Sequence, residues 1–147
     1  MVLGSCRRGQ RLGVDVCRLV DVRVGPPRSG DRVHAVGSRV RDRADEFAAR
    51  HGIPTAHDSY EALVADPDVE AVYVASPHSE HREHALLAIA AGKHVLVEKA
   101  FTVNADEAEQ VFDAAREAGV FVMEAMWTRF LPHVVVMRDV IARGVFT

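Results

Sequence analysis

Short apolar runs alternate with longer amphipathic stretches along most of this chain. Each run is rich in β-branched side chains and is followed by polar or turn-forming residues. Such runs predict strands that are buried on both faces of a sheet. The predicted strands are 33–37, 71–75, 94–97 and 120–123, with a short edge strand at 54–57.

The stretches between these runs place apolar residues three or four positions apart, which predicts helices with one buried face. Glycines such as Gly52, Gly92 and Gly119 are expected to end them. Their expected starts are capping residues or a proline. These starts are Asp42, Ser59, Ser79, Asn104 and Pro132. Strands that alternate with helices through short turns predict a doubly wound α/β domain with a parallel sheet.

Residues 1–32 fit this alternation poorly. The segment 4–9, Gly-Ser-Cys-Arg-Arg-Gly, has the outline of the dinucleotide fingerprint G-x-G-x-x-G, in which Gly4 and Gly9 are candidates for cofactor binding. Cys6 occupies the second glycine position, where a Cβ should weaken contact with a pyrophosphate. Taken alone, this pattern is about as often a chance match as a real one. Apolar residues at helical spacing then predict a helix, on Leu12, Val16, Leu19 and Val20.

The composition is that of an ordinary globular domain. The 147 residues are 48% hydrophobic and 27% charged, which suffices for one domain with a proper core. No apolar run approaches the ~20 residues of a membrane span, and the N-terminus lacks a signal-peptide pattern. We therefore expect a cytoplasmic protein with no membrane partner. In that compartment Cys6 and Cys17 are expected to be reduced thiols.

The net charge of −3 is unevenly distributed. Residues 1–32 hold seven Arg and three Asp, a balance of +4, and the rest of the chain holds 11 basic and 18 acidic residues, a balance of −7. The basic arm contains no aromatic residue for stacking, and no helix-turn-helix or zinc pattern follows it. Nucleic-acid binding is therefore not expected. The contrast also suggests that this segment is partly out of frame or wrongly started.

Polar residues follow four of the predicted strands. The carboxyl ends of parallel strands share one edge of a sheet, and ligands bind there in open α/β folds. Four polar groups at one edge therefore predict a single ligand site, although loops are commonly polar for no functional reason. The groups are Ser38-Arg39, Ser76-Pro77-His78, Glu98-Lys99, and Glu124 with Trp127 and Arg129.

Ser38 and Arg39 bear on the choice of cofactor. An acidic residue here would accept a hydrogen bond from the ribose 2′-hydroxyl of NAD, and none stands at this position. A guanidinium binds phosphate as a planar fork, so this pair favours NADP over NAD. The alternative is a solvated Arg39 at the start of a helix.

Lys99 can place a positive charge or a proton beside a substrate. The alternative is a surface ion pair between Glu98 and Lys99. No metal site is expected, because His78, His81 and His84 fan over about 120° of a helix and do not easily face one ion. One of these histidines is expected to contact cofactor or substrate, and the others are expected at the surface.

Three segments resemble the glucose-fructose oxidoreductase / inositol dehydrogenase family (Gfo/Idh/MocA). They are 75–81 (ASPHSEH), 91–99 (AGKHVLVEK) and 123–130 (MEAMWTRF), and the last is most similar to the dihydrodiol dehydrogenase-like branch. The resemblance implies an NAD(P)-dependent oxidoreductase of sugars, cyclitols or related alcohols. It also implies an N-terminal Rossmann domain and a C-terminal α/β domain that often forms the oligomer interface.

The same resemblance implies roles for individual residues. Lys99 matches the catalytic lysine of a Glu-Lys-Pro motif beside the nicotinamide, and Glu98 matches its glutamate. Ala100 stands where the family has proline, so the backbone that aims Lys99 is expected to be less restricted. The remaining matches lie along the cofactor and near its nicotinamide end. These are Ser76, Pro77 and His81, and then Trp127 and Arg129.

These observations predict three segments: 1–32 as a degraded or misread fingerprint, 33–126 as the nucleotide-binding domain, and 127–147 as the start of a truncated substrate domain. With the first strand incomplete and most of the second domain missing, the chain is expected to be inactive alone. A homo-oligomer is expected only when that domain is present. The alternatives are a non-catalytic nucleotide-binding or interaction module of the same fold, or a non-functional gene remnant.

Overall fold

A six-stranded sheet forms the centre of the protein in the computed structural model, which describes residues 16–20 and 33–144. The strand order is β3-β2-β1-β4-β5-β6, the order typical of a dinucleotide-binding domain. The strands are β1 (Val16–Val20), β2 (Ala35–Ser38), β3 (Thr55–His57), β4 (Ala71–Ala75), β5 (His94–Val97) and β6 (Val122–Glu124). The predicted strands of the regular region are therefore confirmed, with shifts of one or two residues at some ends.

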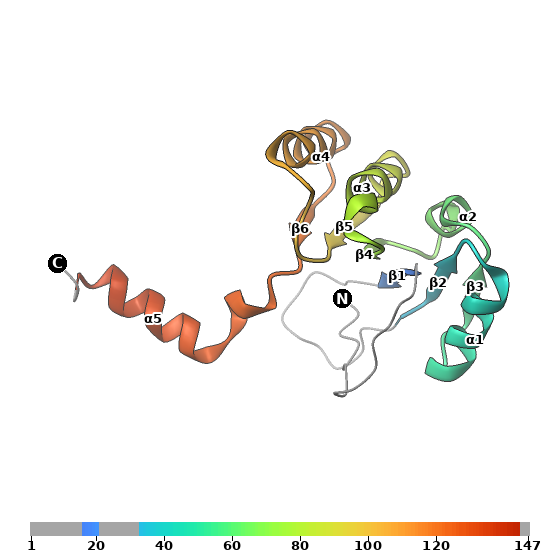
Figure 1. Cartoon of the computed structure of the whole chain (residues 1–147), viewed down its shortest axis with the longest axis horizontal. Coiled ribbons are helices and arrows are strands. Elements are labelled where there is room, and N and C mark those ends of the chain that lie inside the picture. Colours follow the sequence, from blue (N-terminus) through green and yellow to red (C-terminus); the bar gives the residue numbers. More distant parts are fainter. Residues whose placement is uncertain (1–15, 21–32, 145–147) are drawn as a thin grey trace.

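Helices cover both faces of the sheet, as the prediction of a doubly wound domain requires. In Figure 1, α2, α3 and α4 lie side by side over one face, and α1 lies at the β3 end. The helices are α1 (Arg41–His51), α2 (Tyr60–Ala65), α3 (His81–Ala90), α4 (Ala105–Ala118) and α5 (Pro132–Ala142), with short 3₁₀ helices η1 (His78–Glu80) and η2 (Trp127–Phe130).

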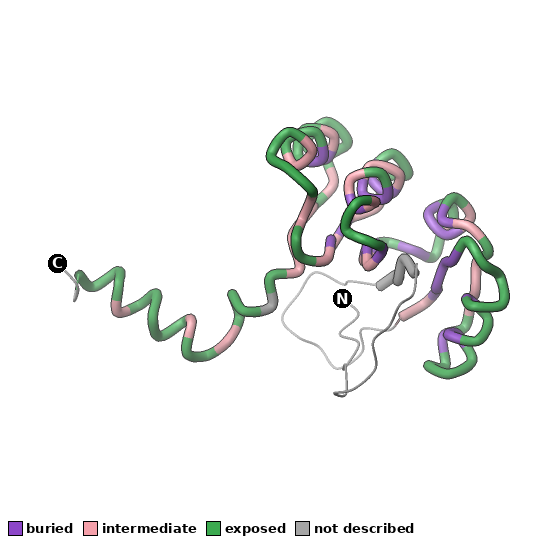
Figure 2. Tube along the Cα trace, in the orientation of Figure 1, coloured by how far each residue is buried: buried purple, intermediate pink, exposed green. Residues whose placement is uncertain are grey.

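Alternate residues of β2 supply two separate cores, because successive side chains of a strand point to opposite faces. Ala35 belongs to the larger core beneath α2, α3 and α4, together with Val72, Val74, Val95 and Val97. Val36 belongs to the smaller core, which α1 covers with Phe47 and Ala48. Purple segments in Figure 2 mark these buried positions within the sheet and on the inner sides of the helices.

The helix that the apolar spacing predicted at 16–20 is wrong, because Val16–Val20 forms strand β1. The segment instead fills the gap between β2 and β4 and pairs with both strands. A helix there would leave the facing edges of β2 and β4 without backbone partners, which explains why pairing overrides local spacing. The other predicted features of the first 32 residues, including Gly4, Cys6 and Gly9, lie outside the described residues.

The direction of β1 is a second correction. It runs antiparallel to both neighbours, whereas the remaining pairs, β2–β3, β4–β5 and β5–β6, are parallel as predicted. Antiparallel neighbours do not need the crossover helix that a parallel pair requires.

The helix starts are only partly as predicted. Ser59 and Asn104 do cap α2 and α4, since their side chains accept hydrogen bonds from the backbone N–H groups of Ala62 and Glu107. Pro132 also begins α5. Asp42 and Ser79 are not caps: Val40 precedes α1, and Ser79 lies inside η1. Gly92 adopts φ 73° after α3, a left-handed conformation that glycine reaches without steric cost.

Helix α5 leads away from the sheet in Figure 1 and contributes no buried residue. It exposes Val135, Val136, Met137 and Ile141. Within the described ranges, no helix has the combined length and apolar character that a membrane crossing requires.

Candidate nucleotide-binding site

The loops that follow β2, β4, β5 and β6 meet at one edge of the sheet. Although β1 is reversed, β2 and β4 are each antiparallel to it and therefore point in the same direction. Strands β5 and β6 are parallel to β4. The topology thus brings together the four polar groups singled out in the sequence, at the edge where open α/β sheets bind ligands.

Ser38 and Arg39 have different roles in the loop after β2. Ser38 is buried, and its hydroxyl oxygen accepts a hydrogen bond from the backbone N–H of Val40 at 3.2 Å, so it shapes the turn. Arg39 is exposed, and its Nη1 donates to Oε1 of Glu80 at 3.3 Å. Glu80 comes from the loop after β4 and lies 41 positions away in the sequence, so no local pattern indicated this pair.

His81 joins the end of β4 to the loop after β5. Its ring is 2% exposed, with Nε2 3.0 Å from the carbonyl oxygen of Ser76 and Nδ1 2.9 Å from that of Ala100. Nearby, Nε2 of His78 lies 2.8 Å from the carbonyl oxygen of Thr102. Both rings therefore contact backbone of the loop after β5, and His81 also contacts that of the loop after β4, so the structure places His78 and His81 as supports. Their predicted contact with the cofactor stays a prediction.

The hydroxyl of Ser76 contacts a histidine that the sequence analysis expected at the surface. Nδ1 of His84 lies 2.8 Å from Oγ of Ser76, and both residues are buried. The ring of Tyr60 packs edge-on against His84. Burial lowers the pKa of His84, and Arg39 and His81 act in the same direction, whereas Glu80 and Glu83 act to raise it. His84 is therefore a neutral member of the loop support near pH 7.

Glu98 holds the backbone that carries Lys99. Its Oε1 accepts a hydrogen bond from the hydroxyl of Tyr73 in β4, and its Oε2 accepts one from the backbone N–H of Lys99 at 2.9 Å. The Lys99–Ala100 peptide bond is cis. Glu98 thus bonds to backbone and not to the ammonium group of Lys99, which differs from the surface ion pair considered as the alternative. Lys99 itself is exposed at the rim.

The loop after β5 is also tied to β6. Oε1 of Glu124 accepts a hydrogen bond from the backbone N–H of Phe101 at 2.9 Å. Beyond β6, Trp127 and Arg129 lie in η2; Arg129 is exposed, and the side chain of Trp127 lies outside the described part of the structure. Pro77 is exposed beside η1. The four loops are therefore linked one to the next along the rim, the first two by the Arg39–Glu80 pair and the others by side chains that contact backbone.

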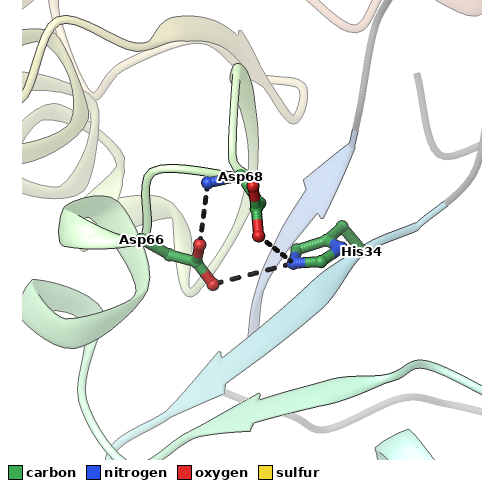
Figure 3. A group of neighbouring side chains, drawn as sticks. All are labelled: His34, Asp66 and Asp68. Atoms are coloured by element: carbon green, nitrogen blue, oxygen red, sulfur yellow. Dashed lines mark hydrogen bonds and ion pairs between the residues drawn. The ribbon is translucent and has the colours of Figure 1, made fainter.

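A second polar cluster lies away from this rim, around the turn that joins α2 to β4. Nε2 of His34 lies 3.8 Å from Oδ2 of Asp66 and 3.9 Å from Oδ2 of Asp68, as Figure 3 shows. The same Oδ2 of Asp66 lies 3.0 Å from Nε2 of His57. The ligand-type atoms of His34, Asp66 and Asp68 lie within 4.8 Å of one another, but direct contacts among the side chains already account for the arrangement.

Asp66 is the centre of this cluster. Burial acts to raise the pKa of its carboxyl, but the backbone N–H of Asp68, the hydrogen bond to His57 and the charges of His34 and His57 together hold that pKa below its usual value. A carboxyl whose pKa is lower in the folded state stabilises the fold above its unfolded pKa. This contribution is lost as the pH falls through the folded value.

Asp66→Asn is expected to lower the free energy of unfolding by about 1–2 kcal/mol at pH 7, because charge-assisted hydrogen bonds become neutral ones. The difference from the wild type should shrink as the pH falls below about 4. Urea denaturation at a series of pH values measures both effects. Asp68→Asn is the matched control, since this side chain is 77% exposed and should change stability by less than about 0.5 kcal/mol. A constant difference down to pH 2 would contradict the assignment.

Comparison with known proteins identifies the group to which these features belong. The family model described as an oxidoreductase family with an NAD-binding Rossmann fold, Gfo/Idh/MocA, matches residues 21–126. The chain belongs to this family. The resemblance seen in the sequence is therefore confirmed, and the sheet is the Rossmann sheet of Gfo/Idh/MocA proteins.

Two relatives show which Gfo/Idh/MocA enzymes are similar. Bovine trans-1,2-dihydrobenzene-1,2-diol dehydrogenase is 49% identical over 118 residues, which are 80% of this chain and 35% of that protein. The D-xylose 1-dehydrogenase (NADP(+)) of Hypocrea jecorina is 46% identical over 117 residues, which are 76% of this chain and 29% of that protein. The similarity to the dihydrodiol dehydrogenase branch is thus confirmed, and the chain spans about a third of the length of these relatives.

Solved structures of Gfo/Idh/MocA proteins match the fold. A 3-ketoreductase from Actinomadura kijaniata in complex with NADP superimposes with a TM-score of 0.70 at 39% identity, covering 78% of this chain and 36% of that one. An NAD binding oxidoreductase from Klebsiella pneumoniae gives a TM-score of 0.72 at 37% identity, covering 77% of this chain and 30% of that one. The chain therefore contains the NAD(P)-binding Rossmann domain of an oxidoreductase family.

Proposed function

We propose that this chain binds NADP in preference to NAD and serves hydride transfer to or from a sugar, cyclitol or dihydrodiol-type alcohol. The observation that carries the proposal is the position of Lys99, which lies two residues after the fifth strand of a Rossmann sheet and whose backbone is held by Glu98, itself bonded to Tyr73. In this reading Lys99 polarises or protonates the substrate oxygen. The nicotinamide supplies the hydride chemistry when bound.

The proposed cofactor contacts lie along the edge of the sheet where the strands end. Arg39 would bind the 2′-phosphate of NADP, and residues of the loops after β4 and β5 would line the cofactor towards its nicotinamide end. Relatives support NADP, since the xylose dehydrogenase of H. jecorina is named for NADP(+) and the A. kijaniata ketoreductase was solved with NADP. The proposed contacts are Gly4, Gly9, Ser38, Arg39, Ser76, Pro77, His78, His81, Glu98, Lys99, Trp127 and Arg129.

The domain division belongs to the same proposal. We place the nucleotide-binding domain at 33–126 and the beginning of a substrate domain at 127–147. Two observations support a boundary near 126: the family match ends there, and α5 leaves the sheet without contributing a buried residue. A partner domain would complete the alcohol pocket and any oligomer interface. Expressed as these 147 residues, the polypeptide is expected to bind nucleotide with little or no turnover.

Isothermal titration calorimetry of the purified chain with NADP and with NAD tests the proposed cofactor. Arg39→Ala should raise the Kd for NADP by about tenfold or more, because a charge-assisted contact to phosphate contributes about 1.5–3 kcal/mol. The Kd for NAD should change by less than about threefold, since NAD has no phosphate at this position.

Arg50→Ala is the matched control for Arg39→Ala. It removes the same charge at the far end of α1, where Arg50 pairs with Glu46 at the surface. Its effect on either Kd should be less than about twofold. Equal losses of NADP and NAD affinity in Arg39→Ala would contradict the role of Arg39 at a 2′-phosphate. Absence of binding by both nucleotides would contradict the proposed function as a whole.

A further inference from the structure

The loop after β4 brings the carboxylate of Glu80 next to Arg39, the residue proposed to bind the 2′-phosphate of the cofactor. Arg39 follows β2, Glu80 ends η1 after β4, and β1 lies between those two strands in the sheet. Nη1 of Arg39 lies 3.3 Å from Oε1 of Glu80, with the two side chains 52% and 26% exposed. The pair therefore spans the two halves of the sheet, and a ligand that enters the rim can reach it.

The second carboxylate oxygen of Glu80 is held differently. Within the described residues, Oε2 is buried and has no hydrogen-bond partner; Nε2 of His84 lies 4.0 Å away. Because burial keeps His84 neutral near pH 7, this ring does not supply a full positive charge. Among the described residues, Arg39 is thus the cation in direct contact with the Glu80 carboxylate. A ligand that binds the guanidinium therefore changes the electrostatic environment of Glu80.

We infer that Glu80 sets the balance between NADP and NAD in this site, an inference that rests on the proposed function. A 2′-phosphate that binds Arg39 must lie close to the carboxylate of Glu80, and like charges repel. A ribose 2′-hydroxyl can instead donate a hydrogen bond to a carboxylate, which is how acidic residues recognise NAD in this fold. Arg39 therefore favours NADP while Glu80 favours NAD.

The usual acidic residue for NAD recognition lies at the end of the second strand, and the sequence offers Ser38 and Arg39 there. Here the carboxylate arrives from a different loop, so the site combines the recognition elements of both cofactors. The physical consequence is a weaker preference for NADP than Arg39 alone would produce. Removing the charge of Glu80 while keeping its shape should strengthen that preference.

Glu80→Gln tests this inference with ligands that differ only at the 2′ position. The pairs are 2′,5′-ADP with 5′-AMP and NADP with NAD, titrated by calorimetry into the 147-residue chain. The smaller pair carries no nicotinamide, so its binding depends on the adenosine end alone. In Glu80→Gln, the ratio of the Kd for 5′-AMP to the Kd for 2′,5′-ADP should rise by about tenfold, and the NAD/NADP ratio should rise with it.

Glu83→Gln is the matched control, because it removes an exposed carboxylate from the first turn of α3, three residues beyond Glu80. In Glu83→Gln, the ratio of the Kd for 5′-AMP to the Kd for 2′,5′-ADP should stay within about twofold of the wild-type ratio. Circular dichroism checks that each variant folds. If Glu80→Gln does not fold, Glu80→Asn is used in its place. An unchanged ratio in a folded, nucleotide-binding variant overturns the role of Glu80 and leaves the proposed function standing. If the wild type binds none of the four nucleotides, both the role of Glu80 and the proposed function are overturned.

Discussion

Lys99→Ala is expected to lower kcat/KM for alcohol oxidation by a factor of about 10²–10⁴, the contribution typical of a positioned proton-transfer group. The affinity for NADP should change by less than about threefold if the ammonium acts on the substrate oxygen. The measurement is made on a chimera that joins this chain to the remaining length of the bovine dihydrodiol dehydrogenase, to which it is 49% identical over 118 residues. Steady-state rates and cofactor Kd values are compared in the same preparations.

Lys99→Arg separates charge from proton transfer in the same chimera. Arginine keeps the positive charge but does not lose a proton at working pH, so turnover should remain low while cofactor affinity is preserved. Full activity of Lys99→Ala would show that the domain is a nucleotide-binding module in which this lysine has no chemical role. Equal losses of turnover and of NADP affinity would instead limit the role of Lys99 to cofactor binding.

Leu63→Ala is expected to lower the free energy of unfolding by about 3 kcal/mol, which is within the range for a fully buried leucine. Leu63 lies in α2, is 0% exposed, and belongs to the larger core. It packs directly over Gly37 of β2: a Cβ at Gly37 would lie 3.0 Å from the Cβ of Leu63. Truncation of Leu63 therefore opens a cavity between α2 and the strand that positions Ser38 and Arg39.

Ile141→Ala is the matched control for Leu63→Ala, because it removes the same number of carbon atoms from a side chain that is 61% exposed on α5. It should change stability by less than about 0.5 kcal/mol. Urea denaturation followed by circular dichroism measures both variants. Similar losses in the two would mean that α2 does not pack on β2 as described.

Most of the regular architecture could be predicted because its signals are local. The apolar runs at 71–75 and 94–97 coincide with β4 and β5, and the caps at Ser59 and Asn104 are as expected. The prediction failed where local and long-range signals disagreed. Val16–Val20 has helical spacing but forms β1, since the edges of β2 and β4 offer backbone partners on both sides.

From residue 33 onward, the sequence by itself determined the order of strands and helices, the family, and the four polar groups that follow the strands, because each depends on residues close together along the chain. The tertiary structure alone decided which of those groups meet. Glu80 reaches Arg39 across 41 positions, and His81 reaches the carbonyl oxygen of Ala100 across 19. Such contacts depend on how two loops lie beside one another at the sheet edge. Periodicity and capping carry no information about that arrangement, since they describe each element separately.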